Sequence, residues 1–151
     1  MNLKELPNNS KIWIYQANRK LTRQECELIL KISHEFIEVW AIHGKLLKAD
    51  AEILCEIFLV LTVDGTEISA SGCSIDKSLQ FMKQIKNDHG IDFLNRNTIA
   101  FYWNNHVFLE LFESVKSQIK AGKIGKNSII FNNLVYSRLQ MESCWKISVR
   151  R

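Results

Sequence analysis

The stretch Ile57-Phe58-Leu59-Val60-Leu61-Thr62-Val63 is the longest apolar run in the chain, and the rest of the fold can be worked out from it. It is far shorter than the roughly 20 residues that a membrane-spanning helix needs. Its residues offer no polar face to water, which is typical of a strand covered on both sides. We therefore expect residues 57–63 to form a central strand, with residues 46–54 as its hairpin partner.

The segments before this hairpin predict a strand followed by a helix. Residues 11–16 (KIWIYQ) are rich in the β-branched and aromatic residues that favour strands. Thr22 with Glu25 three positions later is a capping box, which marks a helix start, and Gly44 is typical of a helix end. The predicted helix buries a stripe of apolar residues at helical spacing, namely Cys26, Ile29, Leu30, Phe36, Ile37 and Trp40.

The segments after the hairpin alternate between helical and strand patterns. A second helix is predicted to start near Ser74 as its N-cap and to end at Gly90, and residues 98–103 are predicted to form a strand. Residues 128–131 and 145–149 are predicted strands on either side of a short helix at 137–141. The second helix is expected to bury Ile75, Leu79, Met82 and Ile85, and a third, ending at Gly122, to bury Phe108, Leu111, Phe112, Val115 and Ile119.

These elements indicate a fold of the α/β or α+β class. We expect a single globular domain over residues 1–151, in which a mixed β-sheet is layered with about three main helices. The composition fits, since 46% of the 151 residues are hydrophobic and only one is proline.

Charge and targeting patterns narrow the classes of partner. The formal net charge of +4 is mildly basic and the charges are interspersed, so nucleic-acid binding is not indicated. The N-terminal residues lack the apolar region of a secretory signal, and no membrane segment is expected. We expect a cytoplasmic protein whose partner is a small molecule or another protein, and the pattern leaves the oligomeric state open.

The cysteines and histidines do not show metal-ligand spacing. The four cysteines are widely separated and are expected to stay reduced in the cytoplasm. Cys26, Cys55 and Cys144 are interpreted as small core residues. No histidine pair lies one helical turn apart, so neither a metal nor another cofactor is expected.

The most informative candidate site is the junction Ser71-Gly72-Cys73-Ser74-Ile75-Asp76, where a strand is expected to give way to a helix. Free backbone N–H groups and the helix dipole at such a start favour a thiolate or a bound anion. As a catalytic set, Cys73 is the candidate nucleophile, His43 its base, and Asp76 or Asp64 the group that orients the base. The same residues also fit a tight turn with a helix cap, in which Gly72 only permits the backbone angles.

As a binding set, the junction supplies Ser71, Gly72 and Ser74. Arg96 can add positive charge for an anion, although solvated surface charge explains it as well. Asn132 and Asn133, which interrupt an apolar run, can bind a ligand or satisfy the backbone of a turn.

Four motifs, SKIWIYQ from residue 10, WAIHG from residue 40, SGCSID from residue 71 and FNNL from residue 131, resemble those of one small bacterial family. The family has no established activity to carry over, and its members are often labelled "ABC transporter ATPase". A phosphate-binding loop requires Gly, four residues and then Gly-Lys-Ser/Thr between a strand and a helix. Its nearest counterpart, Gly125-Lys126-Asn127-Ser128, has Asn127 in the Ser/Thr position and is expected to run from a helix into a strand. We therefore do not expect a P-loop ATPase.

Two hypotheses of function follow from these residues. The first is a small-ligand or protein-binding module with its site around residues 71–76. The alternative is a cysteine-dependent enzyme of acyl or amide transfer, or hydrolysis, that uses Cys73 and His43.

Overall fold

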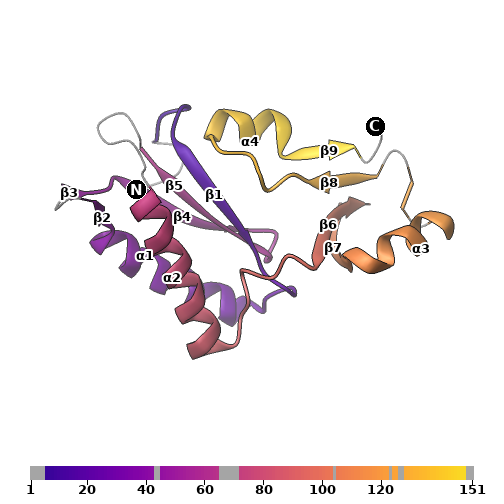
Figure 1. The fold of residues 1–151 in the computed structure, drawn as a ribbon, viewed down its shortest axis with the longest axis horizontal. Helices are drawn as coiled ribbons and strands as arrows, with labels where there is room; N and C mark the ends of the chain where they lie inside the picture. The colour runs from indigo at the N-terminus through magenta and orange to yellow at the C-terminus, as the bar shows by residue number, and fades with distance from the viewer. Residues whose placement is uncertain are drawn as a thin grey trace.

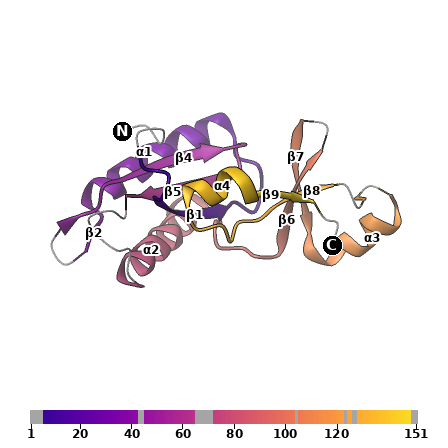
Figure 2. The same cartoon turned by 90° about the horizontal axis from the view of Figure 1, so that it is seen from above.

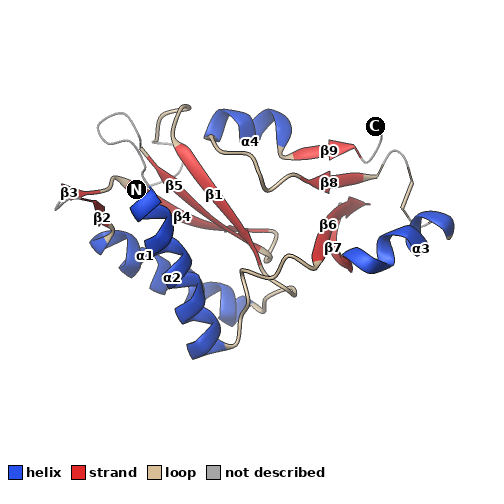
Figure 3. Cartoon of the chain, viewed as in Figure 1, coloured by secondary structure: helices blue, strands red, loops and turns tan. Residues whose placement is uncertain are grey.

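The computed structural model describes residues 6–42, 45–64, 72–103, 105–122, 124–125 and 128–148, with the backbone alone at residues 42 and 72–74. The first half contains β1 (Lys11–Gln16), α1 (Arg23–Val39), a short ribbon of β2 (Ala41–Ile42) and β3 (Lys45–Leu46), β4 (Ala49–Leu54) and β5 (Phe58–Val63). The second half contains α2 (Gly72–His89), β6 (Thr98–Trp103), β7 (His106–Leu111), a 3-10 turn η2 (Phe112–Ser114), α3 (Val115–Lys120), β8 (Ile129–Phe131), α4 (Arg138–Cys144) and β9 (Lys146–Ser148). Figure 3 shows how these helices and strands are distributed.

The described strands form two main antiparallel sheets. One has the order β1-β5-β4 and the other β7-β6-β8-β9. The expected α/β or α+β class is confirmed in its α+β form. The expected single mixed sheet is replaced by two antiparallel sheets, because each sheet is built from hairpins and antiparallel returns.

β5 is the central strand of the first sheet, as expected from its apolar run, and all six of its residues are buried. Leu59, Leu61 and Val63 belong to one core cluster, which includes residues of α1 and α2. Phe58 and Val60 belong to a second core cluster with residues of β6, β8 and the segment around α4. Since neighbouring side chains of a strand point to opposite faces, β5 lies between two layers and needs apolar residues throughout.

The helices cover the first sheet from both sides. Figure 1 shows α1 and α2 together on one side and α4 on the other, and Figure 2 shows the β6–β7 hairpin and α3 at the end of the molecule opposite β2 and β3. Phe36 of α1 stacks on Phe81 of α2 with ring centroids 4.4 Å apart. On the other side Phe58 meets Trp145 edge to face at 5.0 Å.

The start of α1 and the end of α2 follow the sequence signals, but α1 ends at Val39 and not at Gly44 as predicted, because Ala41–Ile42 pairs with β3 as a strand. The capping box of α1 is formed in both directions between Thr22 and Glu25, as predicted. Gly90 follows α2 with a φ of +70°, in the left-handed region where glycine is favoured. The buried stripe of α2 includes Met82 and Ile85 as expected, but Ile75 is exposed, so the packing begins about one turn later than predicted.

The prediction of a long third helix is wrong over its first half. Residues 106–111 form β7, which pairs with β6, and the α-helix occupies only Val115–Lys120. The sequence HVFLELF places apolar residues at spacings that suit both a strand and a helix, so pairing decides. The pairing is stabilised by Phe101 and Phe108, whose rings stack at 5.5 Å, and Asn105 takes a left-handed φ of 63° in the turn.

Two of the cysteines expected in the core are exposed instead. Cys55 lies in the β4–β5 turn with a φ of 56°, and Cys144 ends α4. Trp145 is buried, whereas the neighbouring Cys144 is exposed. Cys26 is half-buried on α1.

Candidate functional site

The predicted junction at residues 71–76 is only partly within the described structure. Ser71 and His43 lie outside the described residues, and for Gly72, Cys73 and Ser74 only the helical backbone is described. Because α2 begins at Gly72, Ser74 lies inside the first turn and is not the N-cap, which corrects our expectation. Asp76 lies on α2 with its side chain exposed.

The start of α2 lies beside the short strand β2. Lys77 Nζ donates a hydrogen bond of 2.6 Å to the carbonyl oxygen of Ala41. The chain segment that leads towards His43 is therefore close to the first turns of α2.

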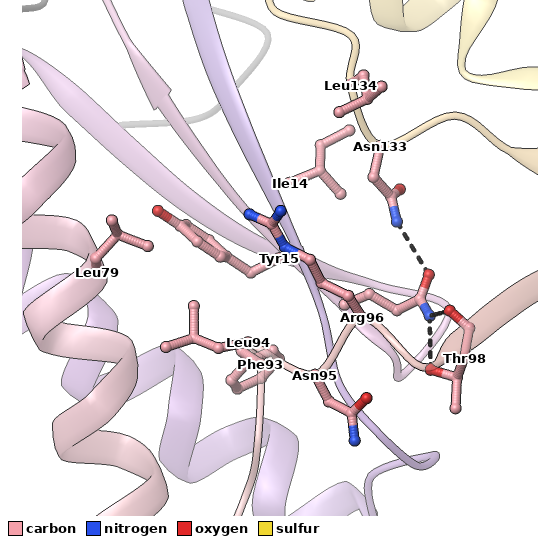
Figure 4. A pocket seen from close by; sticks show the side chains of 11 residues that line it. Ile14, Tyr15, Leu79, Phe93, Leu94, Asn95, Arg96, Thr98, Asn133 and Leu134 are labelled. Carbon is pink, nitrogen blue, oxygen red and sulfur yellow. Dashed lines mark hydrogen bonds between the residues drawn. The ribbon is translucent and has the colours of Figure 1, made fainter. Parts of the chain in front are cut away.

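A cavity of about 340 Å³ lies further along α2, where that helix faces β1. We call it the β1 pocket. Its walls come from β1, α2, the α2–β6 connection and the β8–α4 loop, which brings together segments far apart in the sequence (Figure 4). It is lined by Ile14, Tyr15, Gln16, Leu79, Phe93, Leu94, Asn95, Arg96, Thr98, Asn133 and Leu134.

One side of the β1 pocket is formed by a chain of side-chain hydrogen bonds. Trp145 Nε1 donates to Asn133 Oδ1 at 3.0 Å, and Asn133 Nδ2 donates to Gln16 Oε1 at 2.9 Å. Gln16 Nε2 in turn approaches the carbonyl oxygen and Oγ1 of Thr98 at 3.2 and 3.1 Å. These bonds fix the orientation of both amides and connect the first sheet to the second.

Tyr15 belongs to a second polar contact of the pocket. Its hydroxyl lies 2.6 Å from Ser78 Oγ, and Ser78 Oγ donates to the carbonyl oxygen of Ile75 at 2.8 Å. Because the serine has one hydroxyl hydrogen, Tyr15 is the donor between the two. Burial raises the pKa of Tyr15, and the hydrogen bond to Ser78 opposes this shift. The tyrosine is therefore neutral at physiological pH.

Arg96 supplies the positive charge of the pocket. It lies in the α2–β6 connection with an exposed side chain, and Figure 4 shows the guanidinium on the side of this connection that faces β1. Within the described part of the chain the guanidinium has neither a hydrogen bond nor an ion pair. Of the residues predicted to bind a ligand, Arg96 and Asn133 line this cavity.

Asn132 has a local role in the same loop. Its Oδ1 accepts a hydrogen bond from the backbone N–H of Leu134 at 3.2 Å, which is the turn-forming alternative considered from the sequence. The neighbouring Asn133 points into the pocket instead (Figure 4).

Sequence reasoning missed Gln16 and Thr98 and identified Asn133 only together with Asn132. Each is a polar residue at the end of an apolar strand or just beyond one, and that position was the available signal. What the sequence does not show is that these three ends meet.

A second cavity, also of about 340 Å³, lies between α1 and α2. Its floor is apolar and includes Phe36 and Phe81, and its rim carries Glu35, Asp88 and His89. Among the described residues that line it there is no lysine or arginine. It is the natural competitor of the β1 pocket in any binding experiment.

No protein-family model, curated protein or solved structure matches this chain. Membership of the bacterial family that its motifs resemble therefore stays a prediction. Among the described residues no helix is both long enough and apolar enough to cross a membrane. The same residues contain no group of three His, Cys, Asp or Glu side chains placed to hold a metal ion.

Proposed function

We propose that this protein is a small-ligand-binding domain and that the β1 pocket is its site. The observation that carries the proposal is the unpaired guanidinium of Arg96 at a cavity of about 340 Å³. The cavity falls within the common size range of ligand sites, roughly 300–1,000 Å³, and combines apolar walls with a few oriented polar groups. The proposed site lies beside α2 and β1, about two helical turns after Cys73 of the junction at residues 71–76, which was the candidate from the sequence.

Three polar side chains of the pocket are oriented by hydrogen bonds within the protein, without a ligand. Gln16 and Asn133 are each fixed by partners on other elements, and Tyr15 is tied to α2 through Ser78. A site whose polar groups are already oriented loses little side-chain entropy on binding. This supports binding of a small molecule in the described conformation.

The proposal is tested by NMR, with a set of neutral, anionic and cationic fragments added to the ¹⁵N-labelled protein. We expect shifts at the side-chain amides of Gln16 and Asn133 and at the indole N–H of Trp145. Leu79→Trp, which adds bulk inside the pocket, is expected to suppress them, whereas Leu28→Trp on α1 is the matched control. Absence of shifts at these groups, or shifts confined to the cavity between α1 and α2, would overturn the proposal.

A cysteine-dependent enzyme is the second candidate, and the contact between Lys77 and Ala41 favours it. Ala41, two residues before His43 in the sequence, is bonded to Lys77 of α2, and Cys73 belongs to the first turn of the same helix. In such an enzyme the thiolate attacks an acyl carbon and expels the leaving group, and water then hydrolyses the thioester. The test is turnover of p-nitrophenyl acetate: release of p-nitrophenolate that is lost in Cys73→Ser and kept in Cys144→Ser supports it, and equal rates in both variants exclude it.

A further inference from the structure

We propose that the ligand of the β1 pocket is a small organic monocarboxylate with an apolar body. This inference rests on the proposed function and specifies the chemical class that the pocket selects. It is argued from the charge, the hydrogen-bonding groups and the walls of the pocket in turn.

The charge of the lining favours one negative group. Among the described residues that line the pocket, Arg96 and Tyr15 are the only ionisable side chains, and no Asp or Glu is included. The nearby Asp92 is paired with Lys86, with Oδ2 and Nζ 3.4 Å apart. Since the tyrosine is neutral, the lining carries a single positive charge, which balances a monoanion and leaves a dianion half compensated.

The polar groups still available to a ligand are mainly donors. The side-chain oxygen of Asn133 accepts a hydrogen bond from Trp145, and one of its two amide hydrogens is donated to Gln16. Its second N–H is therefore free. Arg96 offers its guanidinium hydrogens in a planar fork. A carboxylate presents two acceptor oxygens that match this fork in a bidentate pair.

The remaining walls of the pocket are apolar, which favours a ligand whose carboxylate is attached to an apolar group. Five of the lining residues are Ile14, Leu79, Phe93, Leu94 and Leu134, from four different segments of the chain. A bare inorganic anion would leave this surface exposed to water, whereas an aryl or alkyl group would cover it. Leu134, whose side chain is 87% exposed, has the most apolar surface to gain from such contact.

The test compares four probes that share a phenylethyl body: 3-phenylpropanoate, its uncharged amide, 3-phenylpropylamine and 2-phenylethyl phosphate. Binding is followed through the indole N–H of Trp145, which reports on Asn133 through their hydrogen bond. We expect the carboxylate to bind at least about tenfold more tightly than the amide, because a charge-assisted bidentate pair is lost in the amide. In Arg96→Gln this preference is expected to fall to about one.

The control for net charge is Arg23→Gln. Arg23 lies at the start of α1, has a side chain that is 92% exposed and pairs with Glu27. The substitution therefore removes one positive charge at a position that does not line the pocket. The carboxylate preference is expected to survive in this variant. Well-dispersed NMR spectra of both variants show that they are folded.

The outcomes separate the two claims. If the amide, the amine or the phosphate binds as tightly as the carboxylate while pocket resonances shift, the pocket binds ligands but the carboxylate inference is wrong. The inference is also wrong if Arg23→Gln abolishes the preference as fully as Arg96→Gln does. If none of the probes moves a resonance of the pocket at millimolar concentration, the proposed function fails and the inference fails with it.

Discussion

Glu25 is held by two neighbours at the start of α1. Its carboxylate accepts hydrogen bonds from both terminal nitrogens of Arg19, at 2.8 and 2.6 Å, and from the backbone N–H of Thr22 at 3.0 Å. The Arg19 bonds first, and the Thr22 bond after them, lower the pKa of Glu25 from its ordinary value of 4.5 to about 2. A single surface carboxylate thus links the cap of the helix to the preceding loop.

Glu25→Gln tests this charge while keeping an amide that can still close the capping box. A lowered pKa stabilises the folded protein fully above the unfolded value, and this stabilisation is lost as the pH falls from about 4.5 towards 2. Because the pair is at the surface and screened by water, we expect the variant to lose at most about 1 kcal/mol at pH 7. Urea unfolding should show the difference shrinking between pH 5 and pH 2.

The control for that experiment is Glu35→Gln on the exposed face of the same helix. It removes an equal charge from the same helix and therefore controls for the change in net charge. A Glu25→Gln difference that stays constant down to pH 2 would contradict the assignment.

The described cysteines are expected to alkylate in the order Cys144, Cys55, Cys26. Cys144 and Cys55 are both exposed, but loss of hydration around the sulfur raises the pKa of Cys55. The pKa of the half-buried Cys26 is raised by burial and then by Glu56, Glu25 and Glu27. A raised pKa leaves less thiolate, which is the reactive form. Mass spectrometry after brief iodoacetamide treatment measures the order, and labelling of Cys26 before Cys144 would contradict it. The same experiment tests whether Cys73 reacts first, as its place at a helix start predicts.

At the scale of elements, local signals set the helix ends and pairing sets the strands. Thr22 and Gly90 bound α1 and α2 as their chemistry predicts. Residues 106–111 are decided by pairing and not by a local signal. Their apolar residues also suit a helix, but the segment forms strand β7 because it pairs with β6. A segment with two compatible periods is decided by its neighbours.

Gly90→Ala is expected to destabilise the protein by about 1 kcal/mol, because an L side chain is strained in the left-handed region. A Cβ at this position meets no atom within 4 Å, so the cost comes from the backbone and not from a clash. Gly125→Ala is the matched control, with the same free space and no left-handed φ, and should be close to neutral. Equal losses in thermal or urea unfolding of the two variants would contradict this reading.

At the scale of the whole molecule, the two sheets are joined through β5 and through the amide chain of the β1 pocket. The face of β5 that carries Phe58 and Val60 packs against residues of the second sheet, including Phe131. Beside this apolar contact, Gln16 and Asn133 connect β1 to β6 and to Trp145. The pocket is therefore a consequence of how the two sheets meet.

Asn133→Ala is expected to lower the free energy of unfolding by about 1–3 kcal/mol, because it leaves Trp145 Nε1 and Gln16 Oε1 without their partner. Asn95→Ala is the control in the same pocket, since Asn95 Oδ1 bonds only the nearby backbone N–H of Asn97 in an exposed turn. It should cost no more than about 1 kcal/mol. If the two variants lose equal stability, the amide chain does not help to join the sheets.

Sequence patterns identified the central strand, the strand at Lys11–Gln16, the start of the first helix and the end of the second. These follow from the burial of an all-apolar run and from capping residues, whose physics acts within a few residues of the chain. Only the tertiary structure decided that residues 106–111 pair with β6 and that there are two antiparallel sheets. It also decided that Gln16, Thr98, Asn133 and Arg96 meet at one cavity. The reason is that hydrogen bonds spanning 82 and 117 residues depend on how whole sheets pack, and no local pattern encodes that distance.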